Sequence, residues 1–219
     1  MNIYLAVIFL LAGMALGLEV PDIAQRIVLY KCRKKNSVTA KDSRYTTALL
    51  KLGLFILNGS AWCLSGLLAE HFGAAILISF LFTTAILIAI IDLRIRIVPN
   101  ELLLVMVAAG IAFQAVQFGH MAILTSILCM IAMIIFFTVV AGIVGFDKVG
   151  AGDVKLAGAM GLALGYPNII TALIIMSAVF FIYTFTGLML KKLTLKSMLP
   201  FAPFMMTGMV FAMAYMFYS

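Results

Sequence analysis

The sequence predicts an all-α, polytopic integral membrane protein, folded as one helical bundle with about eight membrane segments. Hydrophobic residues make up 65% of its 219 residues, charged residues make up only 11%, and the mean hydropathy is +1.22. Apolar runs of about 18 residues or more, the length at which a helix crosses a bilayer, recur along the chain. The short alternating segments of a membrane β-barrel do not occur in the sequence. We therefore expect a single membrane-embedded domain over residues 1–219 and no sizeable soluble domain.

The apolar runs place the spans near residues 3–19, 46–69, 74–92, 100–118, 121–145, 153–165, 168–190 and 199–218. The first run has no basic residues before it and no convincing cleavage site, so we expect a retained span instead of a signal peptide. The run after residue 153 is too short to cross about 30 Å of hydrocarbon comfortably. It is rich in Ala and Gly, and Gly161 and Gly165 have the Gly-x-x-x-Gly spacing that lets helices approach closely. We expect a short, buried, central helix there.

The formal net charge is +7, and all 15 Lys and Arg residues lie on or beside alternate connections between spans. The connections near residues 70–73, 118–120 and 165–168 carry none of them. This positive-inside pattern predicts that the basic connections face the cytoplasm and that both chain termini lie outside. Orientation and contact with anionic membrane lipids account for the charge, so we expect no nucleic-acid partner.

Two of the basic connections have a second interpretation. The polar connection at about 26–47 lacks hydrophobic periodicity, and it is either a topology anchor or a contact for a substrate or partner. Residues 93–98 alternate as Leu-Arg-Ile-Arg-Ile-Val before Pro99, which predicts a short extended piece after the preceding helix. Its arginines are either orientation charges at the membrane interface or part of a strand that pairs with a bound peptide. In the second case Ile95, Ile97 and Pro99 are candidate substrate-binding residues.

Two aspartates stand where a membrane chain rarely tolerates charge, so they mark a candidate functional site. Asp92 ends the apolar run of residues 76–91, and Asp153 follows two glycines in Gly150-Ala151-Gly152-Asp153. Two spans separate them, which predicts that both face the cytoplasm. A carboxyl pair that shares one proton is the working unit of an aspartic protease, because the ionised member activates water while the protonated member polarises the scissile carbonyl. Gly150 and Gly152 would allow a sharp turn and close approach of a peptide.

Other interpretations of these residues stay open. Asp92 could form an ion pair with Arg94 or Lys155, and Asp153 could simply cap the helix that follows it. The pair could also be the site of a proton- or cation-coupled transporter, an alternative supported by the short helix but opposed by the lack of an evident internal repeat. A membrane scaffold would leave the two aspartates unexplained. The three cysteines are widely spaced and form no Cys-x-x-Cys pair, so we expect no metal site and no cofactor.

The segment Gly-Ala-Gly-Asp-Val-Lys-Leu at 150–156 resembles the Gly-x-Gly-Asp-x-Lys-Leu signature of type IV prepilin peptidases, membrane aspartic proteases of the peptidase A24 family. Asp92, followed by Val-Pro-Asn at 98–100, is similar to the first catalytic aspartate region of that family. Asp147 matches an acidic residue just upstream of the glycines. Residues 199–204, Leu-Pro-Phe-Ala-Pro-Phe, resemble the Pro-Phe-x-Pro-Phe element that opens the last helix. These elements follow the family's order over roughly residue 69 to the last residue.

The resemblance implies an aspartic endopeptidase that cleaves the basic leader of prepilin or pseudopilin precursors at the cytoplasmic face of a bacterial or archaeal-type plasma membrane. Such an enzyme would serve pilus, secretion or competence assembly. The basic loop contains only Cys32, unlike family members with a tetracysteine zinc domain, so N-methyl transfer to the new N-terminus is in doubt. The implied roles are catalysis by Asp92 and Asp153, loop support by Gly150, Gly152, Lys155 and Asp147, and substrate binding by Pro200, Phe201 and Pro203. Lys155 could equally be an orientation charge, and Asp147 could be structural or could steer the substrate.

Overall fold

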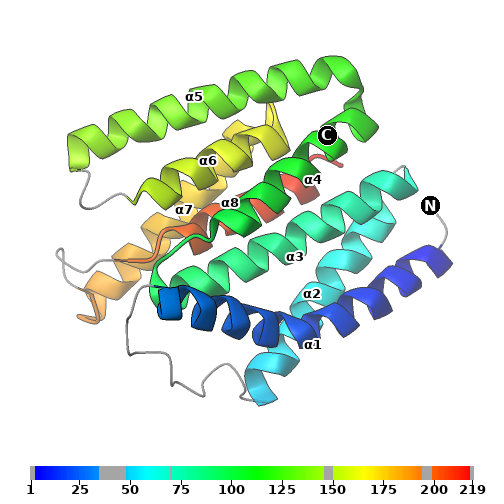
Figure 1. The fold of residues 1–219 in the computed structure, drawn as a ribbon, viewed down its shortest axis with the longest axis horizontal. Helices are drawn as coiled ribbons and strands as arrows, with labels where there is room; N and C mark the ends of the chain where they lie inside the picture. Colours follow the sequence, from blue (N-terminus) through cyan, green and yellow to red (C-terminus); the bar gives the residue numbers. More distant parts are fainter. Residues whose placement is uncertain (1–2, 35–47, 70, 146–149, 194–198, 218–219) are drawn as a thin grey trace.

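The computed structural model describes residues 3–34, 48–69, 71–145, 150–193 and 199–217, and within these ranges the regular structure is entirely α-helical. This confirms the predicted all-α fold class. The helices, shown in Figure 1, are α1 (Ile3–Lys34), α2 (Ala48–Leu68), α3 (Phe72–Ile95), α4 (Asn100–Phe118), α5 (His120–Val144), α6 (Ala151–Leu164), α7 (Asn168–Met189) and α8 (Ala202–Tyr215).

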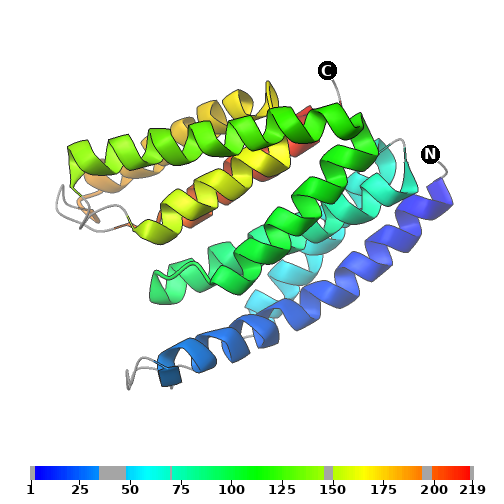
Figure 2. The same cartoon turned by 45° about the horizontal axis from the view of Figure 1, so that its top comes forward.

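Consecutive helices run in opposite directions, so the chain crosses the bundle back and forth (Figures 1 and 2). The first and last described helices have their outer ends, marked N and C, at one end of the bundle. At the other end α1, α3, α5 and α7 finish and α2, α4, α6 and α8 begin. Asp92, near the end of α3, and Asp153, near the start of α6, therefore lie at the same end of the bundle.

Six of the helices, α1 to α5 and α7, are long and apolar enough to cross a membrane. Helix α8 is apolar but shorter, at 14 residues. Large hydrophobic side chains point outward from the bundle, for example Leu128 and Ile135 on α5, which are 59% and 58% exposed. Exposed apolar surface of this extent is typical of contact with lipid. The protein is a multi-pass membrane protein.

Helix α6 is the buried centre of this arrangement, as the Gly-x-x-x-Gly spacing predicts. All nine residues from Leu156 to Leu164 are buried, although the 14-residue helix spans only about 21 Å at 1.5 Å per residue. A Cβ atom added to Gly161 would lie 2.9 Å from the carbonyl oxygen of Cys129 on α5, and one added to Gly110 on α4 would lie 3.0 Å from Cα of Ala163. The small residues therefore allow α4 and α5 to pack directly against the α6 backbone.

The first helix is longer than predicted. It does not end near residue 19 but continues to Lys34, so the first part of the connection expected at 26–47 is helical. Its buried residues Val20, Ala24, Val28 and Cys32 recur at every fourth position and pack on the bundle. The prediction failed because the basic residues between them lower the local hydropathy without breaking the helical period. Residues 35–47 of that connection lie outside the described residues.

The extended piece predicted at residues 93–98 is only partly correct. Helix α3 continues through Ile95, one turn beyond Asp92, and the Arg96 N–H donates to the Asp92 carbonyl oxygen at 2.9 Å. Arg96 then adopts a left-handed conformation with φ of 51°, which ends the helix. Residues 97–99 are non-helical, and Pro99 directly precedes α4. The alternation of arginine and isoleucine therefore did not mark a strand, because helical hydrogen bonds extend over its first half.

Candidate active site

Asp92 is held in place by the start of α8. Asp92 is only 3% exposed. Its Oδ2 accepts a hydrogen bond from the backbone N–H of Ala202 at 3.1 Å. Ala202 is the first residue of α8, where backbone N–H groups have no partner within the helix. Such a helix start favours a negatively charged partner. The segment Pro200–Phe204 therefore contacts Asp92 through its backbone.

Asp153 lies in the first turn of α6, outside the six long spans. Its Oδ2 accepts a hydrogen bond from the Gly150 N–H at 3.2 Å, and its own N–H donates to the Gly150 carbonyl oxygen at 2.9 Å. Burial, and to a smaller extent the nearby Asp92 carboxylate, raise the pKa of Asp153 to about 6, and the Gly150 hydrogen bond opposes both effects. Two aspartates that are 61 positions apart in the sequence are thus close enough for one charge to act on the other.

The two glycines before Asp153 have different structural roles. Gly150 has φ of −69° and ψ of 143°, an extended conformation open to any residue, so the predicted sharp turn does not depend on glycine there. Gly152 is constrained by space, because an added Cβ would lie 3.2 Å from Cβ of Val98. The lack of a side chain at Gly152 lets the start of α6 press against the α3–α4 connection, which follows Asp92 closely in the chain. The observed close approach is therefore between two parts of the protein itself. Close approach of a substrate peptide at these glycines stays a prediction.

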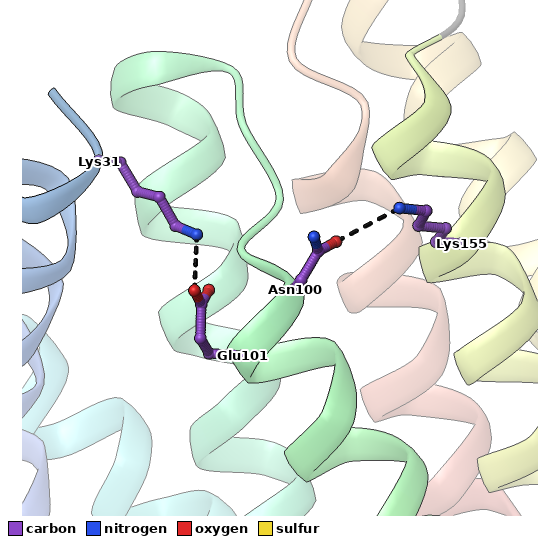
Figure 3. Close-up of polar contacts among 4 residues, drawn as sticks. All are labelled: Lys31, Asn100, Glu101 and Lys155. Atoms are coloured by element: carbon purple, nitrogen blue, oxygen red, sulfur yellow. Dashed lines mark hydrogen bonds and ion pairs between the residues drawn. The ribbon is translucent and has the colours of Figure 1, made fainter. Parts of the chain in front are cut away.

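Lys155 connects α6 to the start of α4 (Figure 3). Its Nζ donates to Oδ1 of Asn100 at 3.5 Å. The neighbouring residue Glu101 forms an ion pair with Lys31 of α1, with 2.7 Å between Nζ and Oε1. In the described part of the chain, Lys155 is within ion-pairing distance of neither Asp92 nor Asp153. This contact between Lys155 and Asn100 was not predicted from the sequence. From the sequence, Asn100 was identified only as part of the Val-Pro-Asn motif.

A model of the type IV leader peptidase family matches residues 79–188, which are 110 of the 219 residues and so half of the chain. The matched region runs from within α3 into α7 and contains both Asp92 and Asp153. The chain belongs to the type IV leader peptidase family. This confirms the predicted family and identifies the protein as a leader peptidase-like membrane protease. The comparisons with curated proteins and with solved structures gave no match.

The other residues proposed for this leader peptidase differ in exposure. Pro99 is buried, and Ile95 packs against the core. The Phe201 ring lies beside two other rings, with centroid distances of 6.1 Å to Phe137 and 5.7 Å to Phe180. Phe201 thus helps to hold the start of α8 against α5 and α7. This packing also positions the Ala202 N–H that donates to Asp92. Substrate contact by these residues, and by the half-buried Ile97, Pro200 and Pro203, stays a prediction.

Three further predictions concern polar residues of the leader peptidase. Asp147 lies outside the described residues. Among the residues that the structure does describe, no group of three or more His, Cys, Asp or Glu side chains could hold a metal ion. Among the described residues, no disulfide bond joins Cys32, Cys63 or Cys129 to another cysteine. At this end of the bundle the two carboxyls, Asp92 and Asp153, lie close enough for the charge of one to act on the other.

Proposed function

We propose that this protein is an aspartic endopeptidase that removes the leader peptide of type IV prepilin-like precursors with Asp92 and Asp153 as its catalytic pair. The proposal rests on one observation: the two carboxyls reach the same end of the bundle from α3 and α6, close enough for the charge of Asp92 to act on Asp153. Placing two acidic groups together in a membrane protein is costly, and their mutual repulsion must be relieved by a shared proton. This is the protonation state that aspartic proteolysis requires.

The different surroundings of the two carboxyls favour different roles. The N–H at the start of α8 stabilises the carboxylate form of Asp92 against the near-complete burial that disfavours its charge. The pKa of Asp153, raised to about 6, means that this carboxyl keeps its proton to a higher pH than an ordinary aspartate does. In the proposed reaction Asp92 takes a proton from water as the water oxygen bonds to the scissile carbon, and Asp153 gives its proton to the carbonyl oxygen. Asp92 then gives its proton to the peptide nitrogen and Asp153 takes one back from a hydroxyl of the tetrahedral intermediate, so the C–N bond breaks, the leader leaves as a carboxylic acid, and both aspartates return to their starting state.

The proposed partners are prepilin or pseudopilin precursors, each with a short basic leader before a hydrophobic helix. The apolar outer surface of the bundle suits a substrate helix in the lipid, and the aspartates near helix ends suit a scissile bond at the membrane boundary. The basic residues support a cytoplasmic position for this end, in a bacterial or archaeal-type plasma membrane. Pilus, secretion or competence assembly would use the product. The chain has three cysteines, fewer than the tetracysteine zinc domain of methylating family members requires, and this is the ground for doubting N-methyl transfer.

Co-expression with a pilin precursor tests this function. We expect Asp92→Asn and Asp153→Asn each to reduce cleavage by about 10²–10⁴-fold or more, the usual contribution of a general acid or base. Asp22→Asn is a matched control, because Asp22 forms an ion pair with Lys51 at 3.0 Å on the α1–α2 side of the bundle. Mass spectrometry of the pilin gives the position of the cut and any N-terminal methylation together. Normal cleavage by either catalytic variant, at normal protein levels, would refute the proposal.

A proton- or cation-coupled transporter is the second candidate, because a short, buried helix carries Asp153 at its first turn. Reconstituted vesicles separate the two functions. Transport predicts an aspartate-dependent ion flux by a wild-type protein that leaves the precursor intact, whereas proteolysis predicts cleavage without such a flux.

A further inference from the structure

A cleft of about 220 Å³ opens between α1 and the start of α4. It is lined by Arg26, Ile27, Tyr30, Lys31 and Glu101. None of these residues belongs to the proposed catalytic pair or to the loop around it. Its volume is below the roughly 300–1,000 Å³ that is typical of pockets for whole small molecules. The cleft thus suits a compact polar group.

The cleft lies where both of its helices leave the apolar region. Glu101 is in the first turn of α4, whose candidate span begins at Asn100. The candidate span of α1 has 31 residues, which at 1.5 Å per residue is about 46 Å, well over the roughly 30 Å of bilayer hydrocarbon. The segment from Arg26 to Lys31 is at the end of this long helix. The cleft therefore sits at the boundary between lipid and water.

Exposed apolar side chains lie one helical turn further into the bilayer. Ile23, 38% exposed, precedes Arg26 and Ile27 by three and four positions on α1. Leu104, 70% exposed, follows Glu101 by three positions on α4. Residues three or four apart lie on the same side of a helix. A lipid whose headgroup occupied the cleft would thus find apolar surface below it for its acyl chains.

The charges of the cleft favour an anion with a single negative charge. Lys31 and Glu101 neutralise each other in their ion pair (Figure 3). Arg26 is exposed, and no residue in the described ranges forms an ion pair or side-chain hydrogen bond with it. The lining therefore carries one uncompensated positive charge. A guanidinium group binds phosphate oxygens in a bidentate manner, and tyrosine is common at membrane interfaces.

We propose that this cleft binds the headgroup of a phospholipid with a net charge of −1, in which the phosphodiester is the only charged group. Arg26 contacts the phosphate oxygens, Tyr30 borders the headgroup, and the acyl chains follow Ile23 and Leu104. This binding is independent of proteolysis, so it does not depend on the function proposed above.

The test uses the full-length protein in neutral detergent, titrated with phosphatidylglycerol or phosphatidylcholine and analysed by native mass spectrometry. We expect wild-type protein to retain phosphatidylglycerol preferentially and Arg26→Gln to bind it about tenfold more weakly, since about 1.4 kcal/mol corresponds to a factor of ten. Arg33→Gln is the matched control, an exposed arginine at the same end of α1 that does not line the cleft. Equal affinity of Arg26→Gln and wild type would overturn the proposal, as would an equal loss in both variants.

Glu101→Gln should change phosphatidylglycerol binding in the opposite direction from Arg26→Gln, and misfolding would not produce tighter binding. Removal of the lining carboxylate should tighten phosphatidylglycerol binding, and weaker binding would contradict the charge argument. Competition with inorganic phosphate identifies the source of the phosphate group. If phosphate displaces the lipid at equal concentration, the cleft is a site for free phosphate and the lipid assignment is wrong; retention of the lipid supports it.

Discussion

At the residue scale, the two aspartates are chemically similar groups in dissimilar settings. Asp92 is almost fully buried and faces the N-terminal N–H of α8, whereas Asp153 is half-buried and is bonded within its own helical turn. Different surroundings are what allow two carboxyl groups to act as base and acid in one reaction. The predictions at this scale concern the proton of Asp153 and the absence of a side chain at Gly152.

The first residue-scale prediction is a dependence of cleavage on pH. The pKa of Asp153 is raised to about 6, so the folded protein keeps this proton above the usual range of an aspartate and loses it as the pH rises through about 6. Because the protonated form is needed to polarise the carbonyl, we expect kcat/KM to fall as the pH rises through that value. The measurement is a pH profile with purified protein and precursor in detergent. A rate that climbs across the same interval would contradict the role of Asp153 as acid.

The second residue-scale prediction concerns Gly152. A Cβ at this position would lie 3.2 Å from Val98, so Gly152→Val should push the start of α6 away from the α3–α4 connection. Overpacking typically costs about 1–3 kcal/mol, and we expect cleavage to fall by about tenfold or more. Gly53→Val is the control, because an added Cβ at Gly53 meets nothing within 4 Å. Recovery of cleavage by the double variant Gly152→Val with Val98→Ala would identify the contact, and full activity of the single variant would refute it.

At the scale of elements, the start of α4 is joined to helices on both of its sides. Asn100 contacts Lys155 of α6, and Glu101 contacts Lys31 of α1 (Figure 3). The same short region follows the α3–α4 connection, in which Val98 packs on Gly152. The position of α6 relative to α3, and with it the approach of the two aspartates, thus depends on contacts made outside the pair itself.

The element-scale prediction tests this connection through Asn100. Asn100→Leu removes the acceptor for Lys155 and should lower kcat about fivefold with little change in KM, the size expected for one hydrogen bond of about 1 kcal/mol. Asn100→Asp keeps an acceptor and should restore the rate. Lys155→Met should have the same effect as Asn100→Leu, and combining them should add little, because both remove one interaction. Additive losses in the double variant would show that the two residues act separately.

At the scale of the whole molecule, the bundle places its functional groups at one end and its packing glycines in the middle. Helix α6 is enclosed along its length from Leu156 to Leu164, so the aspartate at its start is carried by one of the most buried elements. The large exposed hydrophobic residues lie on the surrounding helices. A rigid centre surrounded by lipid-facing helices suits a site that must hold two side chains in fixed relation.

The whole-molecule prediction is the orientation in the membrane. His120 begins α5 at one end of the bundle, and Lys192 follows α7 at the other. In a background without the three native cysteines, an impermeant thiol reagent added to intact cells should label His120→Cys and leave Lys192→Cys unlabelled. Opening the cells should expose Lys192→Cys. The reverse labelling would place the aspartates outside and exclude cleavage at the cytoplasmic face.

Sequence by itself determined the class of fold, the approximate spans, the back-and-forth path and the two aspartates, because hydropathy, charge and short motifs are properties of neighbouring residues. Residues 20–34 show the limit of such patterns, since their helix is visible only once its four-residue stripe is packed against the bundle. Only the tertiary structure decided that the Ala202 N–H, 110 positions along the chain, meets Asp92, and that Asn100 meets Lys155. The cleft beside Arg26 is likewise a product of packing. The physical reason is that these contacts depend on how whole helices lie against one another, which no local pattern of residues specifies.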